Sequence, residues 1–268
     1  MRYSNYRQPQ ERAPLNVVEE KNVVPDFKPC LVVPCYRHVE PLIRILPDLL
    51  HYGVKIIVVD DGNREPKASK LREQVALMNQ VLVRHEINMG KGAAVFSGFK
   101  KARELGFTHV LQIDADGQHD LEDIPTFLSL GAQNPEKMIN GTPVYDHSVP
   151  TCRRLGRYMT HLWVCVELGK CRIVDTMCGM RLYPLEQALG IMHSRHVGRR
   201  MDFDTDIFVR MYWSGVDFLE VPVNVKYSPG TRSNFRGFSD NLRISMMHTR
   251  LCTEKVFHYP AIRKRGYV

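Results

Sequence analysis

Short apolar runs alternate with amphipathic stretches along the first half of the chain. The runs are CLVVPCY (30–36), VKIIVVDDG (54–62), VLVRHE (81–86) and THVLQIDADG (108–117). The stretches between them, which carry apolar positions at helical spacing, are 41–53, 66–80 and 90–106. Strands that alternate with helices of this length indicate βαβ units, and runs without strict alternation fit strands that are buried on both faces. The pattern predicts an α/β fold in which helices flank a mostly parallel sheet.

The second half of the chain is less regular. Helical spacing covers residues 121–131, 152–169, 202–215 and 239–259, and strand-like runs cover 137–144 and 216–227. Residues 228–238 have the composition of a loop. The expected organisation is an extended or disordered N-terminal lead (1–27), one main domain (28–238) and a basic C-terminal helical extension (239–268).

Polar and acidic residues stand where the first four predicted strands end. Ligands of open parallel sheets bind beyond the carboxyl ends of the strands. Those ends carry Pro34–Tyr36, Asp60–Asp61, His85–Asn88 and Asp114–His119. We therefore expect a binding site at this edge of the sheet.

The segment Asp114-Ala-Asp116-Gly-Gln118 has the spacing of a metal site. Alternate residues of an extended chain share a face, so Asp114 and Asp116 can reach one point and Gln118 can add a carbonyl oxygen. Oxygen donors suit Mg²⁺ or Mn²⁺, and two carboxylates leave coordination positions for water and phosphate. The alternative is a polar turn, with Asp120 expected to cap the following helix.

Two other loops carry groups that suit a nucleotide. A carboxylate at Asp60 or Asp61 can accept N–H groups of a uracil or guanine base, although Asp-Gly is also an ordinary turn sequence. The loop 88–92 opens a helix, and its glycines and Lys91 favour an anion there. The sequence fits neither the P-loop pattern nor the dinucleotide-binding glycine pattern, which argues against a dinucleotide oxidoreductase.

The charge balance favours anionic partners. The net charge is +8, from 37 Lys and Arg against 29 Asp and Glu. A nucleic-acid partner is not expected, because the charge is dispersed and no motif interleaves aromatic with basic residues. Seven cysteines without a C-x-x-C pair, and a sequence without a signal peptide or a long apolar run, favour a cytoplasmic protein with reduced thiols.

The segment 241–268 carries six Lys or Arg residues against one Glu, together with apolar residues. Such a segment can lie on an anionic membrane surface, here the inner face of the cell membrane, or it can pack on a partner domain.

The motifs VPCY, VVDDG, NMGKGAA and IDADGQHDLEDIP occur in the order and spacing of family 2 glycosyltransferases. The chain resembles their dolichol-phosphate-mannose-synthase-like branch, and its tail resembles bacterial members associated with lipid or acyl-chain glycosylation. The resemblance spans about residues 28–251 and continues through DTMCGMRLYP and the YSPGTRSNF tail. It implies a GT-A fold, a UDP- or GDP-sugar donor, a divalent metal, transfer with inversion and a lipid-linked or hydrophobic acceptor.

The resemblance also assigns roles to residues. It implies nucleotide binding for Pro34, Tyr36, Asp60 or Asp61, Lys91 and Asp114, and metal binding for Asp114, Asp116 and Gln118. It places the catalytic carboxylate on Asp204, with Asp206 as the second choice. That carboxylate would be the general base for a hydroxyl acceptor, whereas a phosphate acceptor needs none. The simpler interpretation is a helix N-terminus rich in acids.

Arginines supply further candidate contacts. Arg232 and Arg236 precede the last predicted helix and can stabilise a departing diphosphate. Arg153, Arg154 and Arg157 can bind an anionic acceptor such as a lipid phosphate. Both groups can equally be exposed surface residues.

Two other functions fit part of the pattern. A sugar nucleotidyltransferase also uses acids at strand ends, but the glycine- and arginine-rich loop expected after its first strand is missing from VPCYRHVEP. A catalytically inactive nucleotide-binding module with the same fold is the second alternative. The presence of Asp114, Asp116 and Asp204 argues against it.

Overall fold

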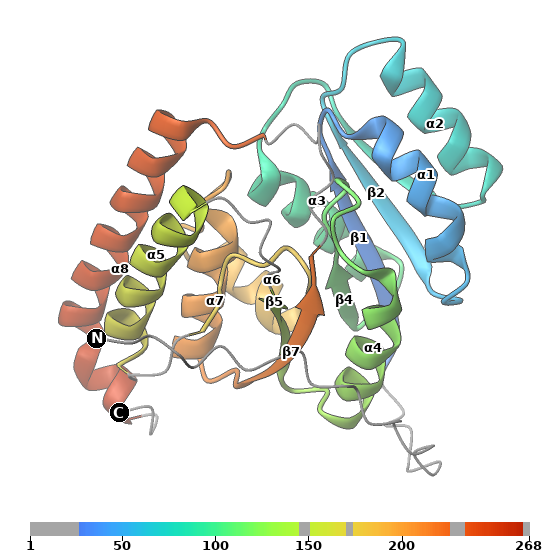
Figure 1. The fold of residues 1–268 in the computed structure, drawn as a ribbon. Helices are drawn as coiled ribbons and strands as arrows, with labels where there is room; N and C mark the ends of the chain where they lie inside the picture. The colour runs from blue at the N-terminus through green and yellow to red at the C-terminus, as the bar shows by residue number, and fades with distance from the viewer. Residues whose placement is uncertain (1–26, 145–150, 170–173, 226–233, 265–268) are drawn as a thin grey trace.

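The computed structural model describes residues 27–144, 151–169, 174–225 and 234–264 (Figure 1). Within 151–156 and 258–264 it describes the course of the backbone only. The predicted N-terminal lead, apart from residue 27, lies outside the described residues.

A seven-stranded sheet runs through the molecule in the order β3-β2-β1-β4-β6-β5-β7. Its strands are β1 Pro29–Cys35, β2 Lys55–Asp61, β3 Val81–His85, β4 His109–Gln112, β5 Met138–Val144, β6 Arg181–Pro184 and β7 Phe218–Asn224. The strands β1 to β4 are parallel, and β5 is parallel to β7. The strand β6 runs antiparallel to both of its neighbours, β4 and β5. All strands except β6 therefore share one direction, and the predicted mostly parallel sheet is confirmed.

The sequence pattern did not predict β6. Its four buried residues read RLYP, begin with an arginine and lack period-two alternation, so they carry little strand signal. Because β6 is antiparallel, its first residue lies at the edge where the other strands end. There Arg181 pairs with Gln112 of β4 and Asn140 of β5. The segment before β6 thus enters the fold at the predicted site.

Helices cover both faces of the sheet. They are α1 Val39–Leu50, α2 Lys67–Leu77, α3 Lys91–Glu104, α4 Ile124–Gln133, α5 Thr151–Leu168, α6 Leu185–Ser194, α7 Phe203–Trp213 and α8 Gly237–Lys264, with a 3-10 turn η1 at Leu121–Asp123. Val32 of β1 packs in a core with α3, α6 and α7, and the next residue, Val33, packs in a second core with α1, α2 and α4. This two-sided burial explains why the strands read as apolar runs.

The predicted helices are present, and α6 is an addition that the sequence pattern did not predict. Asp120 caps η1 as expected, because its side chain accepts from the backbone N–H of Glu122 at 3.3 Å. The helices α5 and α8 pack side by side at one end of the molecule (Figure 1). In the described part of the chain, no helix has both the length and the apolar character needed to cross a membrane.

The close approach of α3 to the sheet yields a stability prediction. A methyl group at Gly98 would lie 2.4 Å from Cγ1 of Val32 and 3.2 Å from Cγ2 of Val59. Both valines are stiff and buried, so Gly98→Ala should lower the free energy of unfolding by about 1–3 kcal/mol through overpacking. Urea denaturation followed by tryptophan fluorescence would measure the change.

Gly190→Ala is the matched control, because nothing lies within 4 Å of a methyl group at that position in α6. It should gain up to about 1 kcal/mol from helix propensity. Equal stabilisation by both substitutions would contradict the tight contact between α3 and the sheet.

Candidate active site at the carboxyl edge of the sheet

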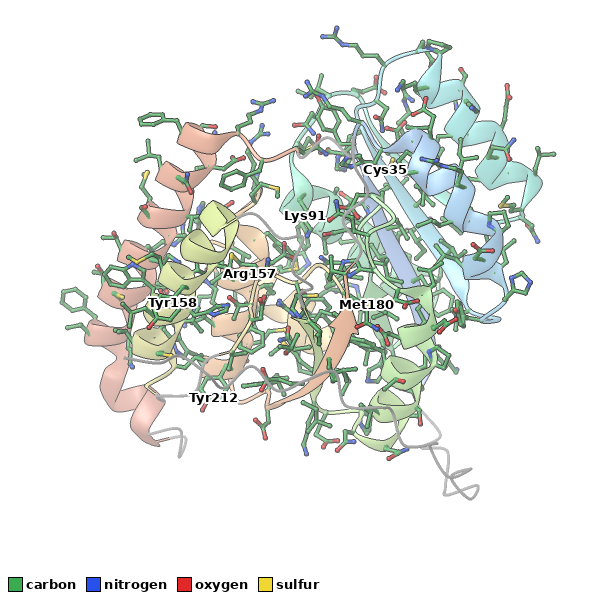
Figure 2. The ribbon with its side chains drawn as sticks, viewed as in Figure 1. Cys35, Lys91, Arg157, Tyr158, Met180 and Tyr212 are labelled. Carbon is green, nitrogen blue, oxygen red and sulfur yellow. The ribbon has the colours of Figure 1, made fainter. Side chains whose placement is uncertain are left out.

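Lys91 lies between two carboxylates from distant parts of the chain. Its Nζ atom lies 2.9 Å from Oδ1 of Asp114 and 2.7 Å from Oδ2 of Asp204. Lys91 opens α3, Asp114 follows β4, and Asp204 lies in the first turn of α7. Figure 2 shows Lys91 in the interior, between α5 and the strand β1. Burial alone would lower the pKa of Lys91, but the two carboxylates outweigh it and raise that pKa well above its usual range.

The other oxygen of the Asp204 carboxylate also has a partner. The side chain of Gln112 donates from Nε2 to Oδ1 of Asp204 at 3.0 Å, and the residue is only 4% exposed. Gln112 is the last residue of β4, so the strand that leads to Asp114 also fixes Asp204. The structure therefore brings together Lys91, Asp114 and Asp204, which lie far apart in sequence.

Arg181 binds the backbone on which this arrangement rests, and the sequence analysis did not identify it. Its Nη1 atom donates to the backbone oxygen of Asp204 at 2.7 Å, and its Nη2 atom donates to the backbone oxygen of Thr176 at 2.9 Å. Its Nε atom donates to Oδ1 of Asn140 at 2.7 Å, and its guanidinium lies 5.0 Å from the ring centre of Phe208. Arg181 is fully buried. An arginine at the start of the otherwise apolar RLYP was the feature of the sequence that could have indicated a buried, functional residue.

Asp114 and Asp116 have opposite pKa shifts. Burial disfavours the ionised form of Asp114, but Lys91 and then His119 oppose it, and the pKa of Asp114 lies below its usual value. Burial and the charge of Asp114 raise the pKa of Asp116. One oxygen of Asp116 accepts from the backbone N–H of Gln118 at 3.0 Å. The pair thus combines one carboxylate whose pKa is lowered with a second whose pKa is raised.

The donor set fits a hard divalent cation that is only partly coordinated by protein. Carboxylate oxygens are the ligands that Mg²⁺ and Mn²⁺ prefer. Among the described residues, no group of three or more His, Cys, Asp or Glu side chains is arranged to hold a metal alone. The side chain of Asp114 is 29% exposed, so the site is open to solvent. A cation on Asp114 and Asp116 would take its remaining ligands from water and from a bound anion.

Gly179 brings the backbone before β6 against the Asp114 carboxylate. A methyl group at this glycine would lie 1.9 Å from Oδ2 of Asp114, so no larger residue fits there without moving the carboxylate. The motif DTMCGMRLYP contains this glycine, and the resemblance marked the motif without assigning it a role. The close approach gives Gly179 a physical function in positioning Asp114.

Asp61 is buried and holds the loop that leads to Lys91. Its carboxylate is bound by four donors from that loop and from β3: His85 Nδ1 at 2.7 Å, Asn88 Nδ2 at 2.6 Å, Met89 N at 2.9 Å and Gly90 N at 2.8 Å. The backbone oxygen of Arg199 accepts from Ala93 N at 3.2 Å and satisfies a further donor of the α3 N-terminus. Much of the predicted anion site thus has internal partners, and Asp61 has a structural role besides the predicted nucleotide contact.

Asp60 is also buried and bound internally. It accepts from the backbone and side-chain nitrogens of Asn63 at 2.9 and 2.8 Å, and from Arg84 Nη1 at 2.8 Å. Asn63 in turn donates to the backbone oxygen of Cys35 at 2.9 Å and accepts from Arg37 N at 2.7 Å. Asp60 and Asn63 therefore join the ends of β1 and β2, and base recognition by Asp60 stays a prediction.

Pro34 and Tyr36 mark the end of β1, beside an asparagine from the far end of the chain. Asn234 Nδ2 donates to the backbone oxygen of Tyr36 at 2.9 Å and lies 3.3 Å from Nδ1 of His38. The guanidinium of Arg37 lies 5.0 Å from the ring centre of Tyr36. The residues just before α8 thus close one side of the predicted nucleotide site, and Asn234 is a further contact that sequence reasoning missed.

Asp206 belongs to a different cluster from Asp204. Its carboxylate accepts from Gly198 N at 2.7 Å, Arg210 Nε at 2.7 Å and Arg250 Nη2 at 2.5 Å. Burial raises its pKa, although the two arginines oppose the shift. Arg210 also binds Glu254 through both terminal nitrogens, at 2.7 and 2.8 Å. Asp206 therefore ties α7 to α8, and the structure does not bring it to Lys91.

Among the predicted arginines, Arg157 is bound internally. It contacts the buried carboxylate of Asp175 through Nε at 2.5 Å and Nη2 at 3.1 Å. Burial acts against the charge of Asp175, but His161 and Arg157 hold its pKa well below its usual range. Arg236 is exposed. The side chains of Arg153 and Arg154, and the whole of Arg232, lie outside the described residues.

Solved structures with similar folds identify the fold of this protein. A mannosyltransferase from Pyrobaculum calidifontis, in complex with GDP-Man and Mn²⁺, matches with a TM-score of 0.56 at 14% identity, over 90% of this chain and 69% of that one. Glucosyl-3-phosphoglycerate synthase from Mycobacterium tuberculosis matches with a TM-score of 0.58 at 15% identity, over 85% of this chain and 80% of that one. The fold is the GT-A fold.

The chain belongs to glycosyltransferase family 2, whose family model, Glycosyl transferase family 2, matches residues 30–187. It is similar to a UDP-N-acetylglucosamine–dolichyl-phosphate N-acetylglucosaminyltransferase from Methanococcus voltae, at 23% identity over 74% of this chain and 85% of the relative. It is also similar to an undecaprenyl-phosphate mannosyltransferase from Micrococcus luteus, at 25% identity over 72% of this chain and 81% of the relative. The predicted likeness to the dolichol-phosphate-mannose-synthase-like branch is confirmed.

The two clusters predict different effects for two neighbouring acids. Asp206→Asn should lower the free energy of unfolding by roughly 3 kcal/mol, because it leaves buried positive charge incompletely balanced. Asp204→Asn should cost only about 1 kcal/mol, because Lys91 keeps Asp114 as its partner. Urea denaturation of both variants would measure the difference. A stable but inactive Asp206→Asn protein would instead make Asp206 the catalytic carboxylate.

Proposed function

We propose that this chain is an inverting, divalent-metal-dependent glycosyltransferase that moves a sugar from a UDP- or GDP-sugar to a lipid phosphate or another hydrophobic acceptor. The observation that carries the proposal is the contact of Lys91 with both Asp114 and Asp204. It joins the predicted metal pair to the predicted catalytic carboxylate at one edge of the sheet. An enzyme that transfers a group from a charged diphosphate needs these groups within reach of one substrate.

The nucleotide would bind across the ends of β1, β2 and β4. Pro34 and Tyr36 would contact the base, with Asp60 or Asp61 as the carboxylate that reads its N–H groups. Lys91 would face the diphosphate, and Arg232, which lies outside the described residues, would add charge. The nucleotide sugars in the names of the Methanococcus relative and of the Pyrobaculum structure support UDP and GDP as the candidates.

Mg²⁺ or Mn²⁺ would be held by Asp114 and Asp116, with Gln118 as a further oxygen donor. When bound there, such an ion supplies Lewis-acid stabilisation for the charge that develops on the departing diphosphate. The raised pKa of Asp116 fits this role, because a carboxylate that gains little from protein partners gains most from an added cation. The lysine contact favours the ionised form of Asp114, which is the form that binds a cation.

Asp204 would act on the acceptor. With a hydroxyl acceptor it would remove the proton as the sugar is transferred, since a general base must lie within hydrogen-bond reach of that hydroxyl. Lys91 and Gln112 orient its two oxygens. With a phosphate acceptor, which is already ionised, Asp204 would position the acceptor instead, and Asp206 would keep its structural role.

The acceptor is proposed to be a lipid phosphate. Relatives named for dolichyl-phosphate and undecaprenyl-phosphate acceptors cover most of the chain and support this choice. Such an acceptor is held in a membrane, so the protein would work at the inner face of the cell membrane as a peripheral, cytoplasmic enzyme. The basic C-terminal segment would contribute to that contact.

The alternative is an inactive nucleotide-binding module with this fold. Only a measurement of transfer activity distinguishes it from the proposed enzyme. A nucleotidyltransferase is less favoured, because the chain belongs to a family of glycosyltransferases.

Calorimetry with UDP and GDP, in Mn²⁺ and then in EDTA, tests donor and metal together. One nucleotide should bind in Mn²⁺, and removal of the ion should weaken binding by at least about tenfold, because diphosphate and ion share ligands. Asp116→Ala should show the same loss in Mn²⁺. Glu122→Ala, which removes an exposed acid in η1, is the matched control and should bind normally.

Equal affinity in EDTA would exclude the proposed metal role. If neither UDP nor GDP bound in Mn²⁺, the donor assignment would be wrong. If the other nucleoside diphosphates failed as well, the proposed nucleotide site would be wrong too.

A further inference from the structure

The outer face of α5 is apolar where a solvent-facing helix would be polar. Between residues 158 and 166, each of the five exposed side chains is apolar and between 45% and 60% exposed. They are Tyr158, Met159, Leu162, Trp163 and Val166. Their spacing places them on one side of the helix, opposite the buried residues Val164 and Leu168. This helix is apolar on both sides, although these five side chains are about half exposed.

The outer face of α8 also carries large apolar side chains, which alternate with exposed, uncharged polar residues. Phe238, Leu242 and Met246 follow one another at intervals of four residues and are between 51% and 86% exposed. Val256 and Phe257, at 73% and 76% exposed, extend the apolar surface along the helix. Between residues 238 and 257 the only exposed charged side chain is Arg243. A long surface helix ordinarily carries charges on its outer face.

The two helices form one surface, which we call the α5–α8 face. Trp163 stacks on His248, with ring centres 6.1 Å apart, and Lys255 Nζ donates to the backbone oxygen of Val166 at 2.6 Å. His248 Nδ1 lies 2.7 Å from Oε1 of the buried Glu167. Figure 1 shows the helices side by side at the end of the molecule away from α1 and α2, and Figure 2 shows Tyr158 at that end. Exposed apolar patches of this kind mark binding surfaces.

The α5–α8 face reaches the rim of the candidate active site. Asn234, which binds the backbone oxygen of Tyr36, is followed at once by the exposed Phe235 and then by Phe238 at the start of α8. At the start of the described side chains of α5, Arg157 binds Asp175, which lies four residues before Gly179. A hydrophobic tail on an acceptor in the site would therefore find apolar surface beside it.

The charge in the last turns of α8 has one sign. Residues 255–264 contain three Lys or Arg and no Asp or Glu. An apolar helical face flanked by cationic residues is complementary to a bilayer with anionic headgroups, where apolar groups enter the acyl boundary and cations meet phosphate. A neutral or basic protein partner would leave this charge unmatched.

We propose that the α5–α8 face docks on the surface of an anionic lipid bilayer. This inference goes beyond the proposed function and rests on it, because an enzyme that uses a lipid acceptor must reach a membrane. It changes the expectation from sequence in one respect, because α5 contributes apolar surface in addition to the C-terminal helix. The bound enzyme would then present the rim near Asn234 to the membrane.

Vesicle flotation of the full chain tests the docking. Phosphatidylcholine vesicles that contain phosphatidylglycerol should carry the wild-type protein, and vesicles of phosphatidylcholine alone should carry less of it. Leu162→Glu and Met246→Glu should each reduce binding to the mixed vesicles by about tenfold or more, since each replaces buried apolar area with a charge. Leu77→Glu, at an exposed apolar position of α2 that is 78% exposed, is the matched control and should bind as the wild type does.

Thermal unfolding and calorimetric nucleotide binding of the same variants separate this proposal from the proposed function. Both should be unchanged in Leu162→Glu and Met246→Glu, because neither side chain contacts the site. Wild-type protein that fails to float, or variants that float normally, would overturn the docking even if nucleotide binds. Sedimentation velocity supplies the last outcome. A wild-type dimer that Leu162→Glu converts to a monomer would make the face a contact between two copies and would also overturn the docking.

Discussion

The candidate site depends on one buried ammonium group. Asp114 and Asp204 both contact Nζ of Lys91, and without that positive charge two carboxylates would repel each other in a partly desolvated edge of the sheet. The lysine can do this because the loop before it is fixed: Asp61 binds the backbone of Met89 and Gly90, and thereby sets where α3 begins. The same contact joins the strand half of the fold to α7. The contacts of Lys91 therefore both position the two carboxylates and balance their charge.

Because β6 is antiparallel, the residues around its start lie at the carboxyl edge of the sheet, beside the candidate site. The strand places Arg181 under Asp204 and Gly179 against Asp114. Arg181 donates to neutral oxygens of Asp204, Thr176 and Asn140, which satisfies a buried guanidinium through hydrogen bonds and leaves the nearby carboxylates for Lys91 and ligands. The helices α5 and α8 pack outside this layer, so their free outer faces remain available to a partner.

The sequence predicted those elements whose pattern depends on nearby residues. The strands β1 to β4 are buried on both faces and read as apolar runs, and parallel order then places Asp61 and Asp114 at one edge without further information. The second half was harder to predict, because β6 is four residues long and Arg181 is charged, so only tertiary hydrogen bonds make its burial possible. The separation of Asp204 from Asp206 was foreseeable from helix geometry, but the arginines that bind Asp206 come from α7 and α8. The exposed apolar side of α5 was not predicted, because an apolar helix face in the sequence does not show whether another element covers it.

The most direct test of the central claim is transfer itself. The protein would be incubated with Mn²⁺, a polyprenyl phosphate and sugar nucleotides of the base that binds, and the lipid fraction would be analysed by mass spectrometry. The account predicts a lipid phosphate that has gained one glycosyl unit, formed only with the divalent ion and lost in Asp116→Ala. If the nucleotide binds but neither phosphate nor hydroxyl lipids gain a sugar, the chain is a nucleotide-binding module, and the contacts of Lys91 are structural.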